Sequence, residues 1–414
     1  VLSYFRLTRM NFPIRHLGKR FGLMMKVAMG QTKIFRKPVI GLLHALVFWG
    51  FCVILIGSIE MVVDGIMGTE RIFRDLGVVY DVIIGVGDLF ALIIAVAILV
   101  FLVRRLVLHV KRFNGIEMDH KKHRDANIAL TLIFLLMVTL MGMNAFYVQY
   151  ALASGHEVYG AYPVSSLIAP WFASMPVDQL YLYHEINWWA HILLIFFFAN
   201  YLPYSKHFHV YLSVPNVFLS RLDPLGKLDT MESVKKEVQM MMDPNASMDM
   251  PAEEDEVGRF GVMDVEDVTW KNYFDSLACT QCGRCTSVCP ANITGKKLSP
   301  RKIVMDVRSR MKEKGPHMVK EGKDYSDSKF LLRDYITEEE LWACTTCNAC
   351  AEECPININH PTLIVEMRRY LVMEESAAPG DLNAIFTNIE NNGAPWQYSQ
   401  EDRMMWAEEL YINE

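Results

Sequence analysis

The first half of the chain consists of long apolar stretches separated by short polar connections. Uninterrupted apolar runs occupy about Pro38 to Val63, Val82 to Val103, Ile128 to Tyr150 and Leu180 to Leu202. Crossing a bilayer as a helix takes about 20 apolar residues, and each run is long enough. The pattern predicts a membrane domain of four helices over residues 1–212. Because the chain opens on Val1 and runs straight into basic residues, we also expect a fifth span truncated before residue 1.

The second half is more polar and predicts a soluble helical domain. Residues 213–265 form an acidic, methionine-rich connector, in which Met231 to Met242 fits an amphipathic helix and Asp243 to Glu256 fits a loop. The helix would lie on the membrane face, on a partner, or in solvent as a plain linker. No β alternation of useful length follows, so we predict an all-α domain at 266–375 and a partner-docking tail at 376–414.

Two helices of the soluble domain have recognisable first turns. Ser299 and Pro300 fit an N-cap followed by a first-turn proline, and they predict a helix through Lys314. Pro361 opens a second helix through Leu371 in the same way.

Lysine and arginine are unevenly distributed among the connections, and this predicts the orientation in the membrane. Short loops rich in these residues stay in the cytoplasm. Residues 1–37 and the loop after the second span are basic, whereas residues 151–180 contain no lysine or arginine. The chain is therefore expected to be a multi-pass protein of the cytoplasmic (inner) membrane, with its soluble domain on the cytoplasmic side. The net charge of -6 averages a basic collar, suited to anionic lipid, with an acidic soluble domain.

Eight of the nine cysteines form two identical runs, each reading C-x2-C-x2-C-x3-C-P. In two-cluster ferredoxins this spacing gives three thiolates to one [4Fe-4S] cluster and sends the fourth to the other cluster. It assigns the first cluster to Cys279, Cys282, Cys285 and Cys354. It assigns the second cluster to Cys344, Cys347, Cys350 and Cys289. With over fifty residues between the runs, the domain fits an α-helical dicluster ferredoxin and an electron-transfer function.

Zinc sites and disulfides are the alternatives for these thiols. Zinc usually takes paired C-x2-C hooks, and a disulfide set would not repeat one compact pattern with a trailing proline. Thiolates reserved for metal also imply a reducing compartment. The ninth cysteine, Cys52, lies in an apolar run and is expected to be a small buried hydrophobe.

Three histidines of the membrane domain are placed as haem ligands would be, although a lone membrane histidine is more often an interhelical hydrogen-bonding group. On one continuous helix His191 and His209 would share a face and stand about 27 Å apart, because five turns separate them. One haem cannot use both. His44, near the cytoplasmic end of its span, and His209 are expected to clamp one haem b. His109, His120 and His123 belong to the basic loop and are not expected to be ligands.

The segment from His191 through Pro203, Tyr204, Ser205 and Lys206 to His209 resembles the last helix of the nitrate reductase gamma-subunit family of dihaem cytochromes b. His44, with Trp49, Gly50 and Phe51 after it, is similar to that family's first ligand helix. The resemblance implies haem b at these histidines. In the family a second histidine stands ten residues after the first, whereas this chain has Ile54. His191 therefore lacks an evident partner for a second haem, with His156 or a residue upstream of Val1 as the remaining candidates.

The order of a cytochrome b-like domain and an HdrC-like dicluster domain, of the kind found in heterodisulfide reductases, resembles the electron transfer flavoprotein:menaquinone oxidoreductases. The segment FGLMMKVAMGQTKIFRKPVIGLLHALVFWGF and the terminal DRMMWAEEL carry this resemblance. It implies a quinone oxidoreductase subunit that passes electrons from a soluble flavoprotein through two [4Fe-4S] clusters and haem b to menaquinone. Family members often continue into a cysteine-rich CCG domain, so a CCG-domain iron-sulfur subunit is a second expected partner.

Two further classes of function remain open. The chain would alternatively anchor a heterodisulfide or sulfur-compound reductase in the membrane, or hold clusters as a non-enzymatic relay scaffold. Quinone reduction consumes two protons, and intramembrane charges are functional candidates, so Asp88 and Glu185 are candidates for a proton relay. Each also has a structural alternative, as a buried polar partner or as a residue of the interfacial aromatic belt. No phosphate-binding loop or nucleophile motif is present in the sequence, and no nucleic-acid partner is expected.

Overall fold

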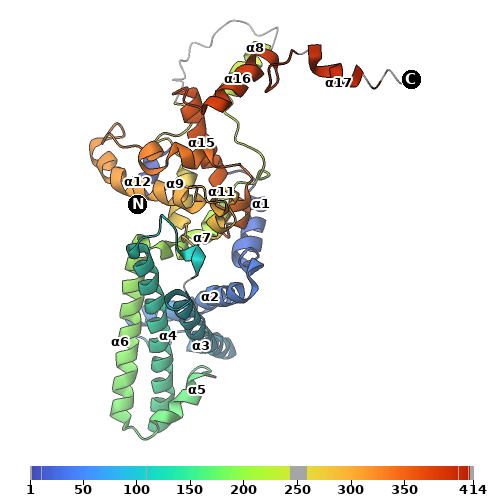
Figure 1. Cartoon of the computed structure of the whole chain (residues 1–414). Helices are drawn as coiled ribbons and strands as arrows, with labels where there is room; N and C mark the ends of the chain where they lie inside the picture. Colours follow the sequence, from blue (N-terminus) through green and yellow to red (C-terminus); the bar gives the residue numbers. More distant parts are fainter. Residues whose placement is uncertain are drawn as a thin grey trace.

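The computed structural model describes residues 2–10, 12–108, 110–242, 259–399, 401–408 and 410. Within these ranges every regular element is helical, and extended pairing is limited to two isolated β-bridges. An apolar helical bundle lies at one end of the molecule and a compact soluble domain at the other (Figure 1). The predicted all-α fold is confirmed. His109 and the loop expected at Asp243 to Glu256 lie outside the described residues.

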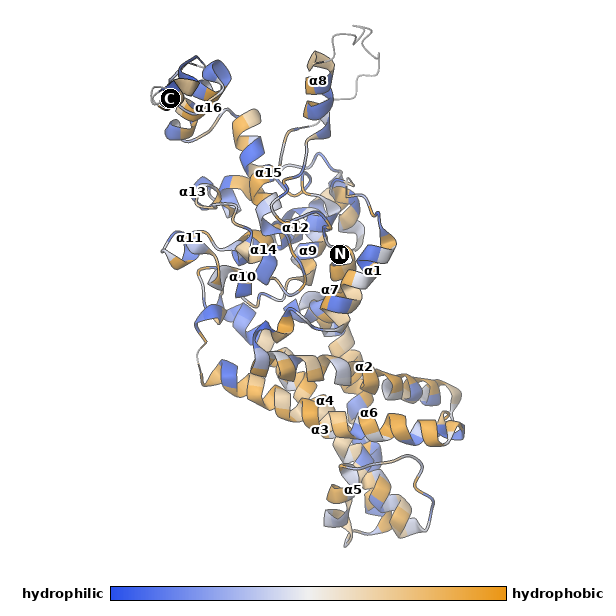
Figure 2. Cartoon of the chain, turned by 90° about the vertical axis from the view of Figure 1, so that its right-hand side faces the viewer, coloured by the Kyte–Doolittle hydropathy of each residue, from blue (hydrophilic) through white to orange (hydrophobic). Residues whose placement is uncertain are grey.

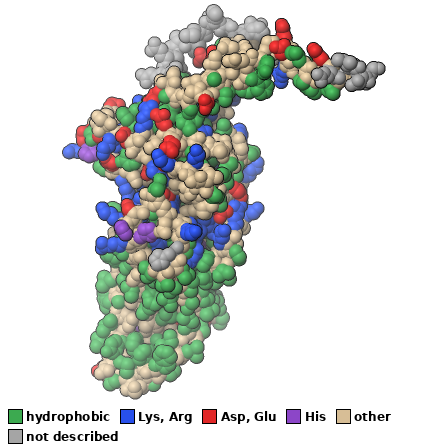
Figure 3. Space-filling model, viewed as in Figure 1, with side chains coloured by type: hydrophobic (Ala, Val, Ile, Leu, Met, Phe, Trp, Pro, Cys, Tyr) green, Lys and Arg blue, Asp and Glu red, His purple; other side chains and the backbone are tan. Residues whose placement is uncertain are grey.

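Four helices are long and apolar enough to cross a membrane, as predicted. They are α2 (Pro38–Met67), α3 (Val78–Leu106), α4 (His120–Ser154) and α6 (Val177–Tyr201), which the turn η7 (Leu202–Tyr204) prolongs. Hydrophobic residues cover the bundle, whereas charged side chains concentrate on the soluble domain (Figures 2 and 3). An apolar surface of this extent suits contact with lipid.

Cys52 corrects one expectation about burial. The apolar surroundings of this residue predicted a buried side chain, but it is exposed on α2. In a membrane helix the apolar residues also face outward toward lipid, so an apolar neighbourhood in sequence does not imply burial inside the protein.

Consecutive helices of the bundle pack side by side, with α2 against α3, α3 against α4, and α4 against α6. Ile94 and Ile98 of α3 and Met137 of α4 belong to the core between them. Gly50 of α2 allows a close approach of α3, because a Cβ at this position would lie 2.6 Å from the ring of Phe90. Small residues at such crossings are typical of membrane bundles.

A collar of short helices joins the bundle to the soluble domain. It consists of α1 (Leu17–Met24), its π-helical continuation η2 (Met25–Met29) and α7 (His209–Phe218), and α7 also packs against α9 (Trp270–Ala278). The buried Arg20 of α1 donates hydrogen bonds to the carbonyl oxygens of Phe218 and Ser220 at 3.2 and 2.7 Å. The collar therefore holds residues from both ends of the bundle's sequence against the soluble domain.

The first described residues pack with the soluble domain, although residues 1–212 were expected to form the membrane domain alone. The short 3-10 helix η1 (Leu2–Leu7) contacts α9 and α12, and Leu7 is part of the soluble domain's core. The backbone amide of Arg9 donates to the carbonyl of Val268, and the amide of Trp270 donates to the carbonyl of Arg9. Burial of apolar side chains in this core accounts for the difference.

The soluble domain is built around α9, α12 (Pro300–Glu321) and α15 (His360–Met373). The Ser299 hydroxyl accepts a hydrogen bond from the Lys302 amide, so the predicted N-cap is confirmed. The helix runs past Lys314, its predicted end, to Glu321. Four short helices carry or flank the cysteines. They are α10 (Arg284–Ser287), α11 (Pro290–Ile293), α13 (Glu338–Trp342) and α14 (Ala349–Glu353).

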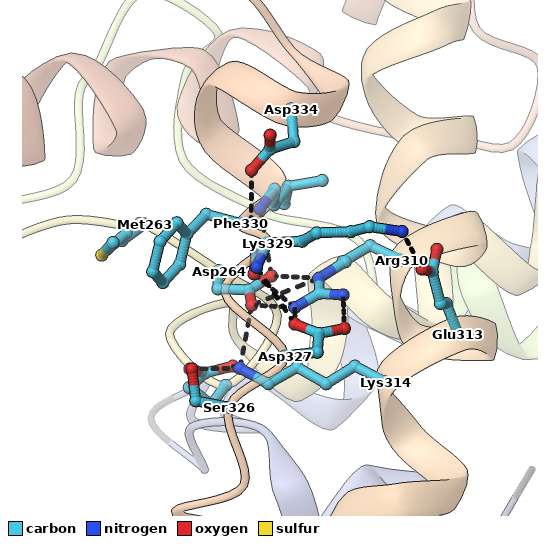
Figure 4. A network of polar contacts seen from close by, with 12 residues as sticks. Met263, Asp264, Arg310, Glu313, Lys314, Ser326, Asp327, Lys329, Phe330 and Asp334 are labelled. Carbon is cyan, nitrogen blue, oxygen red and sulfur yellow. Dashed lines mark hydrogen bonds and ion pairs between the residues drawn. The ribbon is translucent and has the colours of Figure 1, made fainter.

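A buried network of charges fastens two loops to α12 (Figure 4). The fully buried Arg310 donates to both oxygens of Asp264 and to both oxygens of Asp327, at 2.7 to 3.2 Å. Lys314 adds a hydrogen bond to Asp264 at 2.9 Å. These hydrogen bonds from Arg310 lower the pKa of Asp327. Each charge in this core is paired, which burial demands.

Three helices extend away from the soluble domain at the top of Figure 1. They are α8 (Glu232–Met242), α16 (Gly380–Asn392) and α17 (Met405–Glu408). The helix predicted at Met231 to Met242 is confirmed as α8, and it has no buried residue.

Candidate metal centres

The two cysteine runs adopt the same local backbone. Cys279 follows α9 and Cys344 follows α13, and each thiol accepts a hydrogen bond from the amide two residues later, at 3.4 Å. The second and fourth residues after each of these cysteines have positive φ, namely Gln281 and Gly283 in one run and Thr346 and Asn348 in the other. Such turns point successive amides and thiols inward, as a metal cluster requires.

The thiols fall into two neighbouring groups, each drawn from both runs. The Cys354 thiol interacts electrostatically with those of Cys282 and Cys279. The Cys344 thiol interacts with those of Cys289 and Cys347, as does that of Cys350. We call these the proximal group (Cys279, Cys282, Cys285 and Cys354) and the distal group (Cys289, Cys344, Cys347 and Cys350). Their membership corresponds to the crossed assignment from the spacing rule.

Burial keeps these thiols protonated while no iron is bound. It raises the pKa of Cys279 to about 11 and the pKa of Cys354 to about 12. Iron binding releases these protons, because only the thiolate is a ligand. Among the described residues, no three His, Cys, Asp or Glu side chains converge closely enough to hold one metal ion.

Arginines surround the proximal group and join it to the membrane domain. The buried Arg301 forms an ion pair with Glu117 at 2.6 Å and donates to the carbonyl oxygens of Arg112 and Asn114, all in the connection between α3 and α4. The buried Arg284, between two proximal cysteines, donates to the carbonyl of Lys33 at 2.8 Å, just before α2. The proximal group therefore lies directly against the bundle.

Gly283 shows how closely the proximal cysteine run approaches the connection between α3 and α4. A Cβ at this position would lie 2.3 Å from the carbonyl oxygen of Arg112 and 2.8 Å from a guanidinium nitrogen of Arg301. Its φ of +73° also favours glycine. Both constraints act on the residue next to Cys282.

The distal group has fewer charged neighbours and more contact with solvent. Arg368 donates to the carbonyl oxygens of Leu341 and Cys344. Cys347 is exposed, and so is Ile293, four residues after Cys289. This group is therefore accessible from solvent.

His44 and His209 lie near each other at the soluble-domain end of the bundle, close enough for their rings to interact electrostatically. The Nδ1 atom of His44 is buried without a hydrogen-bond partner among the described residues. The Nδ1 atom of His209 lies 3.3 Å from the Lys206 carbonyl, so Nε2 is left for another partner. Burial lowers the pKa of His209 to about 3, which keeps its imidazole neutral, as a haem ligand must be. These features fit a haem held between α2 and α7.

The structure corrects the placement of His209 on the last span. The helix α6 ends at Tyr201, and the short turns η7 and η8 (Lys206–Phe208) precede α7, which begins at His209. Pro203 cannot donate a backbone hydrogen bond, so the helix breaks and the five-turn geometry does not apply. His207 was not among the expected ligands, yet its ring lies 5.5 Å from that of His209 and interacts with His44.

His191 lies away from this pair, buried on α6, with its Nδ1 atom 3.0 Å from the Thr139 hydroxyl. It lines a cavity of about 610 Å³ between α2, α3, α4 and α6, and Ile54 lines the same cavity. Ile54 has no ligand atom. His156, the candidate partner within the chain, lines the same cavity and is exposed.

The two predicted proton-relay residues both line this cavity, but their partners differ. Asp88 is 1% exposed and accepts hydrogen bonds from the amides of Val164 and Ser165, the Ser165 hydroxyl and Asn144. It thus anchors the start of α5 (Ser165–Ile168). Glu185 lines the cavity and is half-buried. Glu60, which is 5% exposed and lines the same cavity, was missed, although a carboxyl group inside an apolar span is itself a signal of function.

Residues 278–358 match the family of the 4Fe-4S dicluster domain, and the predicted ferredoxin domain is confirmed. The chain is 28% identical over 442 residues to the probable iron-sulfur-binding oxidoreductase FadF of Bacillus subtilis, covering 99% of this chain and 58% of that protein. It is 29% identical over 410 residues to the EtfAB:quinone oxidoreductase of Syntrophomonas wolfei, covering 93% and 53%. No solved structure matches.

A further relative is a subunit of the ferredoxin/F(420)H(2)-dependent CoB-CoM heterodisulfide reductase of Methanosarcina acetivorans. It is 35% identical over 106 residues, or 25% of this chain and 52% of that protein. The chain thus spans little more than half the length of each of these relatives. Together they point to a membrane-associated iron-sulfur oxidoreductase subunit that takes part in electron transfer.

Proposed function

We propose that this chain is the membrane subunit of a respiratory oxidoreductase that passes electrons from a soluble partner to menaquinone. Two [4Fe-4S] clusters, bound by the distal and proximal cysteine groups, and haem b, bound by His44 and His209, form the path. The main support is the contact of the proximal group with the entrance of α2, through Arg284 and the carbonyl of Lys33. Arg284 also interacts electrostatically with His44, which supports a short step from the proximal cluster to the haem.

The order of the cofactors follows from exposure. The distal group includes the exposed Cys347, so it suits exchange of electrons with a soluble protein. The proximal group is covered by the connection between α3 and α4 and is near Lys206, whose charge interacts with the Cys279 thiol. Lys206 is three residues from His209. These contacts support a path from the distal group to the proximal group and then to the haem.

The partner and the orientation belong to the proposal. The relative named EtfAB:quinone oxidoreductase supports an electron transfer flavoprotein as donor, and a CCG-domain iron-sulfur subunit is the second candidate. The basic residues that surround the proximal end support a cytoplasmic location for the soluble domain. Four helices of sufficient length and hydropathy support a multi-pass protein.

A membrane anchor of a heterodisulfide or sulfur-compound reductase is the second candidate function. The similarity to the heterodisulfide reductase of Methanosarcina acetivorans supports it. In that case the two-electron sulfur chemistry belongs to a partner subunit, and this chain carries electrons only. The identity of the protein that co-purifies with the chain separates the two functions.

The test starts from chain purified without air and measures iron, acid-labile sulfide and haem. About eight iron and eight sulfide per chain, with haem, are expected from two cubic clusters and the histidine pair. The chain is then reduced with dithionite and mixed with a short-chain menaquinone, and cluster and haem absorbance are followed. Reoxidation of both supports the proposal. Clusters without haem, or no reaction with the quinone, would contradict it and leave an anchor or a relay scaffold.

A further inference from the structure

The cavity that His191 lines lies at the end of the bundle away from the soluble domain, and the electron path proposed above does not explain it. Its volume is about 610 Å³. Polar and ionisable side chains gather along its walls, among them Glu60, Arg71, Tyr162, His184 and Glu185. Such groups are costly inside a membrane and are retained mainly for function. A cavity with apolar walls and a few converging polar groups is the usual form of a ligand site.

Arg71 organises one wall of the cavity. Its guanidinium donates hydrogen bonds to the hydroxyls of Tyr162 and Tyr80 at 2.6 and 3.2 Å, and it lies 3.7 Å from the centre of the Tyr147 ring. The Tyr80 hydroxyl donates to Glu60 at 3.4 Å, and the Phe73 amide donates to the other oxygen of Glu60 at 3.0 Å. The Glu60 carboxyl group is thus held in one position by this network.

Two histidines on α6 line the opposite wall. His184 and His191 are seven residues apart, so they share a helix face about 10.5 Å apart along the axis. The Nδ1 atom of His184 is 3.1 Å from the Met143 carbonyl. Because a carbonyl only accepts, Nδ1 carries the proton and Nε2 is left as an acceptor. The Thr139 hydroxyl donates to the Leu135 carbonyl at 2.9 Å and thus accepts from Nδ1 of His191 at 3.0 Å.

These groups fit a quinone better than a second haem. A haem held by His191 needs a second axial ligand. The α2 wall carries Ile54, and His184 shares the helix face of His191. His156 also lines the cavity, but it is exposed and its ring stacks on that of Tyr150. A quinone ring needs flat aromatic walls, hydrogen bonds to two carbonyl oxygens and a source of protons. Trp188 and Trp189 also line the cavity, and their rings supply the aromatic wall. Ile54 is ten residues from His44, about 15 Å along α2, so the ring would lie within reach of the haem site.

We propose that this cavity binds the quinone ring and that Glu60 is its proton-exchanging residue. This inference rests on the proposed function and adds the location of the quinone site. Reduction adds two electrons, from the cofactor path, and two protons to the quinone, and an O–H bond forms at each carbonyl oxygen. One proton comes from the Glu60 carboxyl group and is replaced from water at the cavity mouth. The other comes from water through Nε2 of His184.

The test measures quinone-dependent reoxidation of the dithionite-reduced chain in lipid nanodiscs, with menaquinone-1 as the probe. Glu60→Gln keeps the acceptor for the Phe73 amide but cannot exchange a proton. We expect it to slow reoxidation at least about tenfold and to remove an ionisation from the pH profile. His184→Phe is expected to weaken quinone binding. The matched control is Asp75→Asn, since Asp75 is exposed in the loop between α2 and α3 and does not line the cavity.

A photoreactive azido-naphthoquinone gives a second readout that does not depend on turnover. Crosslinks in residues 53–71 and 181–191, competed by menaquinone-1, are expected. Crosslinks confined to peptides near His44 and His209, or a Glu60→Gln chain that reacts like the wild type, would overturn the cavity site and leave the proposed function standing. A second haem lost in His191→Ala would also overturn it. A wild-type chain that never reacts with quinone would instead overturn the proposed function.

Discussion

The proximal and distal cysteine groups share one sequence pattern and one local backbone, yet their surroundings differ. Four arginines lie at the proximal group: Arg112, Arg284, Arg301 and Arg308. At the distal group Arg368 donates to the Cys344 carbonyl and interacts with its thiol, and Cys347 is exposed. Positive charge stabilises the reduced, more negative state of a cluster, and cluster potentials depend on such surroundings. The two clusters are therefore expected to differ in reduction potential. The proximal cluster should have the higher potential, so that electrons move from the distal cluster toward the membrane.

The largest expected effect comes from the fourth cysteine of each run. Cys289→Ser is expected to remove the distal cluster and retain the proximal one, because its thiol neighbours Cys344 and Cys350. Iron would fall from about eight to about four per chain, and one of two electron paramagnetic resonance signals would disappear. Cys354→Ser is expected to do the opposite. Loss of the proximal signal alone in Cys289→Ser would contradict the crossed ligation, and Cys52→Ser serves as the control.

The next effect concerns the haem at the proximal end. His44→Ala or His209→Ala is expected to abolish the proposed haem absorbance there, because each removes one of the two proposed ligands. Both cluster signals should remain, since neither histidine belongs to a cysteine group. Haem is measured as the pyridine haemochrome and the clusters by paramagnetic resonance. Full haem content in both variants would show that another pair, such as His207 with a different partner, holds it.

Charge substitutions would test the predicted difference in potential. Arg308→Met removes a buried cation that interacts with the Cys279 thiol. A unit positive charge several Å from the cluster, at an effective dielectric constant of about 20, stabilises the reduced cluster by roughly 2 kcal/mol. Removal of this charge should therefore lower the reduction potential of the proximal cluster by about 50–100 mV. Redox titration monitored by paramagnetic resonance measures this shift. Arg368→Met is the counterpart at the distal group, and equal shifts of both signals in either variant would contradict the assignment.

The smallest effect is a dependence of stability on pH. His360 opens α15, is fully buried, and has its pKa lowered to about 4 by that burial. In the unfolded chain the pKa of His360 is near 6.5, so between about pH 4 and pH 6.5 the unfolded chain binds more protons than the folded chain. The free energy of unfolding is therefore at its full value above about pH 6.5 and falls toward pH 4. Between pH 7.5 and pH 5 the free energy of unfolding should drop by about 2 kcal/mol. Urea unfolding followed by cluster absorbance measures it, and His360→Gln should reduce the slope.

Sequence patterns predicted the features that depend on local spacing. The four apolar runs, the cysteine runs and the N-cap at Ser299 each express a short-range rule, and the corresponding helices and dicluster domain are confirmed. The features that sequence patterns did not predict depend on distant contacts. The ion pair of Arg301 with Glu117 joins residues 184 positions apart. Glu60 becomes a candidate because Arg71 and Tyr80 fold over it, and its own helix gives no sign of this.

Pairing of the first described residues with the soluble domain constrains the topology of the whole chain. The Arg9 amide and the Val268 carbonyl are 3.0 Å apart, so both must lie on the same side of any membrane that the chain crosses. A chain whose two points meet on one side has crossed an even number of times between them. The four helices found among the described residues satisfy this parity rule, and a single added or skipped crossing would break it. Reporter fusions in each connecting loop can therefore be checked against this even number of crossings, which does not depend on the lysine and arginine content of the loops.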